Sequence, residues 1–254
     1  MSRRVFRRYV LPTLTIAGLI ALWQVLCVVL DIPVWLLPAP SLIFQKLVEW
    51  GDKLPLHTWV TLYETLAGFA LAIAVGIPLA ILIVYSEVLQ NTIYPILVIF
   101  QSVPKVAIAP LFLVWVGYGA ISKILVAFLV AFFPIVVDTA TGLNAVPREL
   151  MELMKVLRAS PYHIFKKIRF PAALPHIFSG LKVAITLAVI GAVIGEFVGS
   201  DKGLGYLILI SSSHMDTGLA FGSMAILAVI GIGLFVGVAW LERVICPWQT
   251  TEHQ

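Results

Sequence analysis

The sequence has 254 residues, of which 61% are hydrophobic and only 12% are charged, about half the charged fraction of a typical soluble protein. Its mean hydropathy is +1.03 and its formal net charge is +4. This composition excludes a disordered, collagen-like, disulfide-framework or free cytosolic protein. The basic residues are confined to the N-terminus and one polar stretch, a pattern that indicates a lipid surface rather than nucleic acid.

The first predicted transmembrane helix is the uncharged run of 22 residues from Tyr9 to Leu30, which is long enough to cross about 30 Å of hydrocarbon. The preceding Ser2-Arg3-Arg4-Val5-Phe6 resembles a twin-arginine export signal. The apolar run is longer than the hydrophobic region of such a signal, however, and no small-residue cleavage site follows it. Segment 41–53 is too short to span and is expected to lie along the outer interface, where its tryptophan is favoured.

Five further spans are predicted from apolar runs, some of which carry isolated charges. They cover Thr65–Ser86, 92–115 with Lys105, 121–141 with Asp138, 177–199 with Lys182 and Glu196, and Thr217–Leu241. These runs lack the apolar–polar alternation of a transmembrane β-barrel. The predicted fold is therefore an all-α membrane protein with six transmembrane helices.

Lysine and arginine set the predicted orientation, because cytoplasmic segments of membrane proteins are enriched in them. With the N-terminus inside, eleven of these residues lie in cytoplasmic segments and four in outer segments. Both termini and segment 142–176 are therefore expected in the cytoplasm, and segments 31–58 and 200–216 outside.

Segment 142–176 is a basic insert that a simple connection between two spans does not need. Pro147 is expected to begin one short helix, and Ser160 with Pro161 to begin a second, which Pro171 would end. The first helix carries apolar side chains among charged ones: Leu150, Met151, Leu153, Met154 and Leu157. Such a helix either lies on the lipid surface or docks into a groove of another protein.

This loop contains Glu152, then a turn, and then Ile168-x-Phe170-Pro171-x-x-x-Pro175. The pattern resembles the cytoplasmic "EAA" loop of binding-protein-dependent ABC importer permeases. Further stretches across about residues 10–248 resemble the nitrate, sulfonate and taurine branch of that family, among them Gly76-Ile77-Pro78-Leu79, Pro104-Lys105-Val106-Ala107, Phe132-Phe133-Pro134 and Gly203-Leu204-Gly205-Tyr206. The loop departs from the family pattern at Leu153 and Met154, which replace two alanines, and at Arg158, which replaces a glycine.

The resemblance implies one permease domain over residues 1–254, of the type I ABC importer kind, in a bacterial inner membrane. The implied partners are two cytoplasmic ATP-binding subunits, a second permease copy that forms a homodimer, an extracytoplasmic substrate-binding protein and membrane lipid, without nucleic acid. It also implies a coupling loop, about 142–176, that contacts the ATPase through Glu149, Leu150, Glu152, Leu153, Arg158, Ala159, Ser160 and Phe165.

ATP is expected to be bound and hydrolysed by the partner ATPase. The sequence has no G-x-x-x-x-G-K-[ST] motif, so ATP and Mg would be bound by the separate ATPase. No metal site is assigned to this chain, because its histidines show no ligand pairing at helical spacing. No catalytic residue or cofactor is assigned to it either. The group Ser211–Ser213 with His214 and Asp216 is interpreted as a polar loop rather than a hydrolase site.

Charged side chains within spans are costly and usually face a cavity or a partner. Pro104 and Pro110 flank Lys105 and are expected to break the third span, freeing backbone groups that only a protein-lined or wet cavity satisfies. The predicted lining of the translocation path is Gln101, Ser102, Lys105 and Glu196. Alternatively, the Lys105 side chain snorkels to the membrane interface, or it pairs structurally with one of the acidic residues Glu64, Asp138 and Glu196.

A cation on the path favours a small anionic substrate, such as a sulfonate, taurine or nitrate. Related permeases also carry pyrimidine vitamin precursors and aromatic carboxylates, so these stay open. A membrane scaffold or an intramembrane hydrolase is the alternative from another functional class. The spacings Gly191-x-x-x-Gly195-x-x-x-Gly199 and Gly233-x-x-x-Gly237 are expected to serve helix packing within the subunit rather than a dimer seam.

Overall fold

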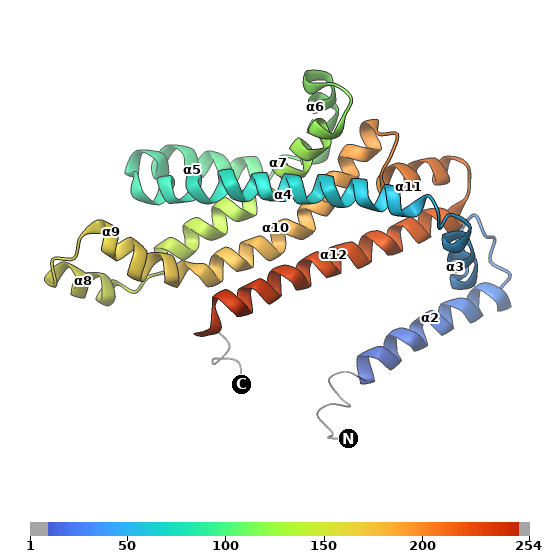
Figure 1. The fold of residues 1–254 in the computed structure, drawn as a ribbon, viewed down its shortest axis with the longest axis horizontal. Coiled ribbons are helices and arrows are strands. Elements are labelled where there is room, and N and C mark those ends of the chain that lie inside the picture. The colour runs from blue at the N-terminus through green and yellow to red at the C-terminus, as the bar shows by residue number, and fades with distance from the viewer. Residues whose placement is uncertain (1–9, 249–254) are drawn as a thin grey trace.

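The computed structural model describes residues 10–248, and within that range the chain consists of helices without strands (Figure 1). The all-α prediction is therefore confirmed. The export-signal pattern, the N-terminal arginines and both chain ends lie outside the described residues. In chain order the helices are α2 Leu11–Val29, α3 Pro40–Glu49, α4 Leu54–Tyr85, α5 Glu87–Gln101, η2 Lys105–Ile108, α6 Ala109–Val116, α7 Ala120–Asn144, α8 Arg148–Val156, α9 Pro161–Ile164, a π-helical turn Phe165–Arg169, α10 Phe170–Gly199, α11 Leu204–Ser213 and α12 Thr217–Ile245.

Five helices in the described range are long and apolar enough to cross a membrane: α2, α4, α7, the continuous helix Pro161–Gly199, and α12. The predicted third span is instead a pair of helical segments, Glu87–Gln101 and Lys105–Val116, bent by 94°. The predicted break is therefore confirmed, and the helical region begins at Glu87, five residues before the predicted start. Pro104 explains the break, because it lacks a backbone donor and disfavours helical geometry at the residue before it.

Helix α4 is longer than the uncharged run that predicted it, because it begins at Leu54 rather than at Thr65. Its first part contains Glu64, whose side chain is 1% exposed and lies 3.5 Å from the Lys123 ammonium on α7. A helix can carry a buried carboxylate when an opposite charge accompanies it. The charge therefore does not mark the helix boundary that the sequence suggested.

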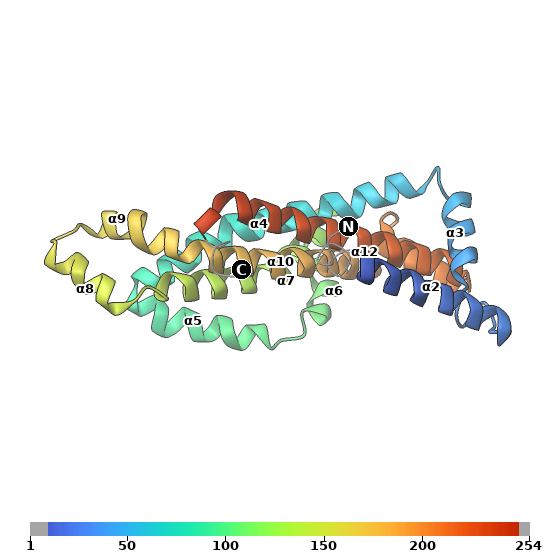
Figure 2. The same cartoon turned by 90° about the horizontal axis from the view of Figure 1, so that it is seen from below.

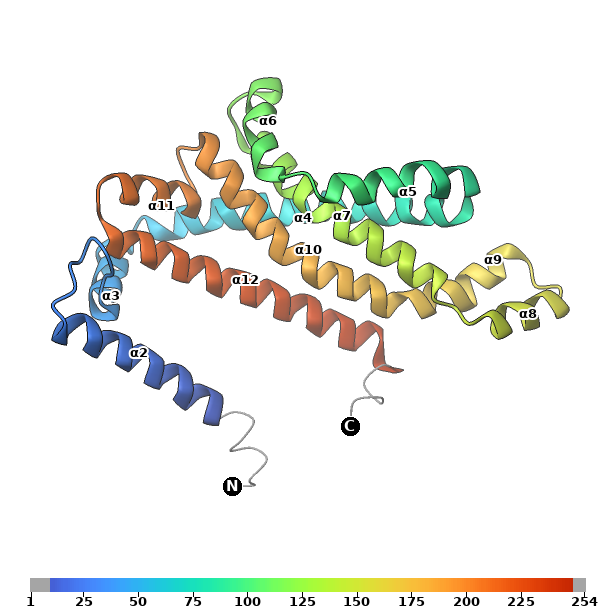
Figure 3. The same cartoon turned by 180° about the vertical axis from the view of Figure 1, so that it is seen from behind.

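The long helices α4, α7, α10 and α12 run roughly along the long axis of the molecule (Figures 1 and 3). Helices α8 and α9 lie at one end of this bundle, and α3 and α11 lie at the other (Figure 2). Helix α2 extends away from the bundle beyond α3, and Cys27 is its one buried residue. The bundle thus separates the basic loop from the segments that were expected outside.

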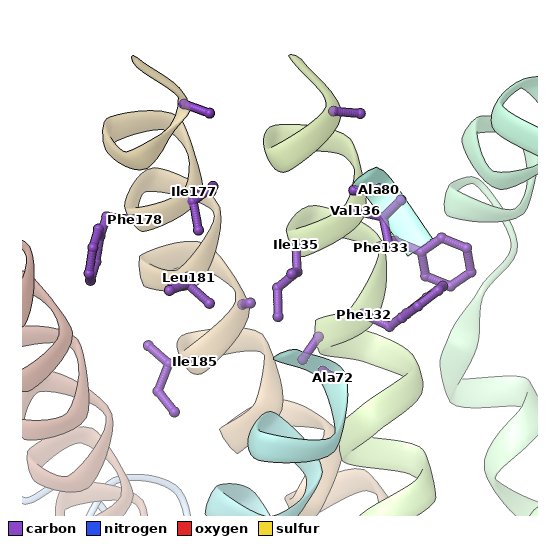
Figure 4. Close-up of a cluster of buried hydrophobic side chains, with 14 of the residues drawn as sticks. Ala72, Ala80, Phe132, Phe133, Ile135, Val136, Ile177, Phe178, Leu181 and Ile185 are labelled. Carbon is purple, nitrogen blue, oxygen red and sulfur yellow. The ribbon is translucent and has the colours of Figure 1, made fainter. Parts of the chain in front are cut away.

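The hydrophobic core lies between α4, α7 and α10 (Figure 4). Small residues of α4 face larger aromatic and branched side chains of the other two helices, which lets the backbones approach closely. The labelled core residues are Ala72 and Ala80 of α4, Phe132, Phe133, Ile135 and Val136 of α7, and Ile177, Phe178, Leu181 and Ile185 of α10. This core holds the three helices together.

Glycines tighten the same contacts. A Cβ added at Gly191 of α10 would lie 2.7 Å from the Cα of Ala127 on α7, and one at Gly195 would lie 2.9 Å from the Cα of Lys123. A Cβ at Gly68 of α4 would lie 2.6 Å from the Ala127 side chain. Helices α4, α7 and α10 therefore pack backbone against backbone along much of their length.

The two predicted glycine spacings, on α10 and on α12, differ in how closely they pack against other helices. The stripe that contains Gly191 packs within the subunit, so that prediction is confirmed. Gly233 and Gly237 of α12 have no atom of a described residue within 4 Å of an added Cβ, so for this pair the prediction is wrong.

The second helix of the basic loop does not end at Pro171, and this prediction is wrong. The chain continues from Pro161 through the π-helical turn Phe165–Arg169 into α10, giving one helix of 39 residues. A π turn shifts the hydrogen-bond register of a helix and so makes room for a proline that would otherwise clash with the preceding turn. The loop and the fifth span are therefore parts of one helix.

Replacing Gly191 with valine is expected to destabilise the bundle, because the added side chain collides with the backbone of α7. Overpacking of this kind costs about 1–3 kcal/mol, and the melting temperature of the detergent-purified protein should fall by several degrees. Gly233→Val is the matched control, since the same side chain meets open space on α12. Equal melting temperatures for the two variants would contradict the packing described here.

Candidate functional site

Helix α8 projects its side chains from the end of the bundle, and none of its residues is buried. Leu153 is 50% exposed and Val156 is 80% exposed, and the carboxylates of Glu149 and Glu152 lie among such apolar side chains. An apolar patch with charged neighbours at the tip of a protein is typical of a surface that docks a partner. The geometry therefore fits the docking interpretation of the loop.

The turn after α8 is held by Arg158 in the left-handed conformation, with φ +49°. The Arg158 N–H donates to the carbonyl of Lys155 at 3.0 Å, and the Ala159 N–H donates to the carbonyl of Met154 at 3.0 Å. A residue with a Cβ is strained in this region by about 1–2 kcal/mol, and glycine is not. The position that carries glycine in the resembling family therefore needs a glycine-like backbone here too.

The second half of the loop is anchored to the bundle. Ser160 caps α9, its hydroxyl accepting from the His163 N–H at 3.4 Å. Phe165 packs edge-on against Tyr85 at the end of α4, with ring centroids 5.9 Å apart, and the Arg169 guanidinium lies 5.4 Å from the same ring. Movement of the loop is thereby linked to α4 and α10.

The eight residues predicted to contact an ATPase differ in solvent exposure. Ala159 and Phe165 are half-buried, and Phe165 serves the contact with α4. The other six are exposed and share one end of the molecule: Glu149, Leu150, Glu152, Leu153, Arg158 and Ser160.

The break between α5 and η2 is the second candidate region. Gln101 and Ser102 are exposed there. The Lys105 ammonium donates to the Gln101 carbonyl at 3.0 Å and lies 5.1 Å from the centre of the Phe133 ring. No carboxylate within residues 10–248 forms an ion pair with Lys105, so the alternative of a structural pair is wrong.

A cavity of about 400 Å³ lies between the end of α4, the start of α5 and the end of α7. Its polar side chains are neutral: Gln90, Tyr94, Thr141 and Asn144. Amide and hydroxyl groups both donate and accept hydrogen bonds, so this lining can hold an uncharged polar solute.

Five polar residues gather at the other end of the bundle, and we call them the outer polar cluster: His57, Thr61, Glu64, Lys123 and Glu196. Each is at most 9% exposed. Lys123 lies 3.5 Å from a Glu64 oxygen and donates to the Ser200 hydroxyl at 2.6 Å. The Thr61 hydroxyl donates to Glu196 at 2.6 Å. The cluster links α4, α7, α10 and the turn before α11.

The sequence predicted that Glu196 lines the translocation path and gave Glu64 as an alternative partner of Lys105. Both side chains are at most 1% exposed, and they contact Thr61 and Lys123 respectively. Lys123 lies in the first turn of α7 and is 5% exposed. His57, Thr61 and Glu64 share one face of α4 at helical spacing, and that pattern could have drawn attention to them. Their pairing partners lie more than fifty residues away, so no local pattern indicates the contacts.

The serines that the sequence placed in a loop belong to α11, and this prediction is wrong. The Ser213 hydroxyl donates to the Ile210 carbonyl at 2.7 Å, and that of Ser211 donates to the Leu207 carbonyl. Asp216 caps α12 and pairs with Lys46 of α3 at 3.2 Å. Hydrogen bonds from Lys46 to Glu49 and Asp216 raise the pKa of that ammonium. These groups fasten helices together rather than forming a nucleophile and a base.

Comparison with known proteins identifies the family to which this architecture belongs. The family described as "Binding-protein-dependent transport system inner membrane component" matches residues 69–250, which is more than half of the chain. The chain belongs to this family. Its members are the permease subunits of ABC transporters, in which a separate subunit hydrolyses ATP, so this chain is a transport subunit and not an enzyme.

Curated relatives match over nearly the whole chain. A probable ABC transporter permease of Haemophilus influenzae is 38% identical over 92% of this chain and 96% of its own length. A formylaminopyrimidine transport permease of Halalkalibacterium halodurans is 35% identical over 95% of this chain and 96% of its own length. A putative aliphatic sulfonate permease of Bacillus subtilis is 32% identical over 92% and 86%. Taurine and nitrate permeases are among the further relatives.

The fold also matches a solved permease. The structure of the MetNI methionine ABC transporter in an inward-facing conformation superposes with a TM-score of 0.64 and 21% identity, covering 74% of this chain and 94% of that one. The permease is therefore of the type I importer fold, a multi-pass membrane protein for small solutes.

Replacing Arg158 with glycine is expected to stabilise the permease by about 1 kcal/mol, because glycine adopts the left-handed turn without strain. The free energy of unfolding in detergent, measured from denaturant titration, should rise. The exposed Arg148→Gly change removes the same charge at the opposite end of α8, where it relieves no strain, and serves as control. A lower stability for Arg158→Gly would show that the arginine side chain contributes more than its backbone costs.

Proposed function

We propose that this permease forms half of the translocation path of an ATP-driven importer in a bacterial inner membrane, with a second copy of the same chain. Two cytoplasmic ATPases would dock on the coupling loop, and an extracytoplasmic binding protein would deliver the solute at the opposite end. The observation that carries this proposal is the exposed apolar and acidic tip of α8 on a loop that continues directly into a transmembrane helix. ATP and Mg belong to the partner in this arrangement.

The orientation follows from the charges of the loop. Lys166, Lys167 and Arg169 lie together in the π-helical turn at the α8 end of the bundle. Positive charge of this density favours the cytoplasmic side, where it also contacts anionic lipid. We therefore place α8 in the cytoplasm and α3 and α11 outside, with both chain termini in the cytoplasm.

The second copy is supported by the break in the third span. Backbone groups freed at a helix break find no partner in hydrocarbon, so this region must face protein or a water-filled cavity. No residue of α5 is buried, and Gln101 and Ser102 lie at its exposed end. A second copy facing α5 across a wet path would cover both, with Gln101, Ser102 and Lys105 lining the path.

For the substrate we propose a small anion, such as a sulfonate, taurine or nitrate. The Lys105 ammonium supports this, because its contacts are a carbonyl oxygen and an aromatic ring, which leave its positive charge without a counterion among the described residues. A pyrimidine vitamin precursor is the second candidate, and an aromatic carboxylate would share features of both. The neutral cavity beside α5 and the formylaminopyrimidine relative favour the pyrimidine.

The first test is to purify the tagged permease from its native membrane in mild detergent and assay ATP hydrolysis. A stoichiometric ATPase with vanadate-sensitive turnover is expected to accompany the permease. If the permease purifies alone and supports no ATP hydrolysis, the docking interpretation of α8 would be contradicted, and the interpretation that α8 lies on the lipid surface would be favoured.

Reversing the charge of Glu152 is expected to uncouple the importer. Glu152→Arg adds a positive charge near Lys155 and Arg158 on the docking surface, and repulsion of this kind weakens association on the order of tenfold. The co-purifying ATPase should decrease while insertion of the permease into the membrane is unchanged. Reversal of Glu87, an exposed acidic residue at the start of α5, is the control. An unchanged ATPase yield with Glu152→Arg would contradict the docking assignment.

Neutralising Lys105 tests the substrate. Lys105→Gln is expected to reduce uptake of an anion several-fold, while Lys105→Arg, which keeps the charge, should retain it. Cells that carry each variant are compared for uptake of labelled taurine, nitrate and an alkanesulfonate, with formylaminopyrimidine in parallel. Full anion uptake by Lys105→Gln would remove Lys105 from the path, and uptake of formylaminopyrimidine alone would favour the second candidate.

A further inference from the structure

The N-terminus of α11 is capped by side chains of other helices. The first N–H groups of a helix have no partner within the helix, and a side chain of the preceding residue usually accepts one of them. Here that residue is Gly203, which has no side chain to do so. The outer polar cluster supplies the acceptors instead, from α4 and α10.

Three successive backbone donors are satisfied in this way. The Gly203 N–H donates to His57 Nδ1 at 3.1 Å, and the Leu204 N–H donates to the Thr61 hydroxyl at 2.8 Å. The Gly205 N–H donates to Glu196 Oε2 at 2.5 Å. A carboxylate at a helix N-terminus is further stabilised by the helix dipole. Glu196 therefore holds the start of α11 by a direct hydrogen bond.

The two glycines of the Gly203-Leu204-Gly205-Tyr206 motif make this contact possible. Gly203 has φ +107°, and a Cβ there would collide with the Glu196 carboxyl group. A Cβ at Gly205 would lie 2.8 Å from Glu196 Oε2. Any larger residue at either position would displace the carboxylate from the end of α11. The two glycines thus leave the space that the Glu196 carboxyl group occupies.

Glu196 lies one turn before the end of the helix that begins in the coupling loop. That helix runs from Pro161 to Gly199 without a break in its backbone, roughly 58 Å at helical rise. Glycine contacts at 191 and 195 press its outer half against α7. A displacement at the loop is therefore carried to Glu196 by a single element.

The charges around Glu196 fix its position within the bundle. Lys123 lies 3.5 Å from a Glu64 oxygen, and it also holds the turn before α11 through the Ser200 hydroxyl. Buried charges of this kind are retained where they specify one arrangement. The Glu196 carboxylate thus has a fixed place relative to α4, α7 and the turn.

We infer that Glu196 is a positioning residue that makes the outer helix α11 move together with α10. It couples the end of the permease that faces the binding protein to the end that faces the ATPase. This inference rests on the proposed function, because it assumes that ATP moves the coupling loop. Thr61 shares the role, since its hydroxyl contacts both Glu196 and the first turn of α11.

Hydrogen–deuterium exchange of the purified permease–ATPase complex tests the inference, with and without ATP and vanadate. In the wild type, exchange in α8 and in α11 is expected to change between the two states. Glu196→Gln keeps the size of the side chain but has one acceptor oxygen where the carboxyl group has two, so Thr61 and Gly205 can no longer both donate to it. Exchange in residues 204–213 should rise at least tenfold and lose its dependence on ATP, while α8 keeps its response and basal ATP hydrolysis stays within twofold.

Asp201→Asn is the matched control, since Asp201 is exposed in the same turn, and it should behave as wild type. Thr61→Val should reproduce the effect of Glu196→Gln and serves if that variant does not fold. Two results would overturn the inference. One is that the exchange of α11 still responds to ATP in Glu196→Gln or Thr61→Val. The other is that α8 of the wild type responds to ATP while α11 does not. If α8 of the wild type does not respond either, the proposed function itself fails.

Discussion

Hydrocarbon offers no hydrogen bonds, and the structure of this permease follows from the need to satisfy every backbone group without water. Long helices meet that need along most of the chain. Helix ends need other partners, and two of those in the described range, at the break after Gln101 and at the start of α11, obtain them differently. The first is left exposed, as expected of a region that faces a wet path, whereas the second is closed by side chains of α4 and α10.

The continuous helix from Pro161 to Gly199 joins these regions to the coupling loop. Its π-helical turn admits Pro171 and lets one element extend from the cytoplasmic tip to the outer polar cluster. Because α4, α7 and α10 pack through glycines, they are expected to move as a unit rather than bend separately. Alternating access in this permease would then be a displacement of that unit, started at α8 and received at α11.

Much of the fold could be predicted from the sequence, because apolar runs, prolines and the distribution of positive charge are local signals. The all-α class, the break near Pro104 and the exposed α8 needed nothing more. The continuity through Pro171 could not be predicted, since it depends on a π turn that the local pattern does not encode. The contacts of Lys123 with Glu64 and of Thr61 with Glu196 join helices that are distant in the sequence, so only the packed bundle reveals them.

The central claim is that α8 is the docking site of an ATPase. A photocrosslinker placed at Leu153, in membrane vesicles that contain the assembled transporter, tests it most directly. An adduct with the ATP-binding subunit is expected, and its yield should change when ATP and vanadate are added. The same crosslinker at Val48, an exposed residue of α3 at the opposite end, should give no such adduct. Adducts of Leu153 with lipid alone would contradict the account.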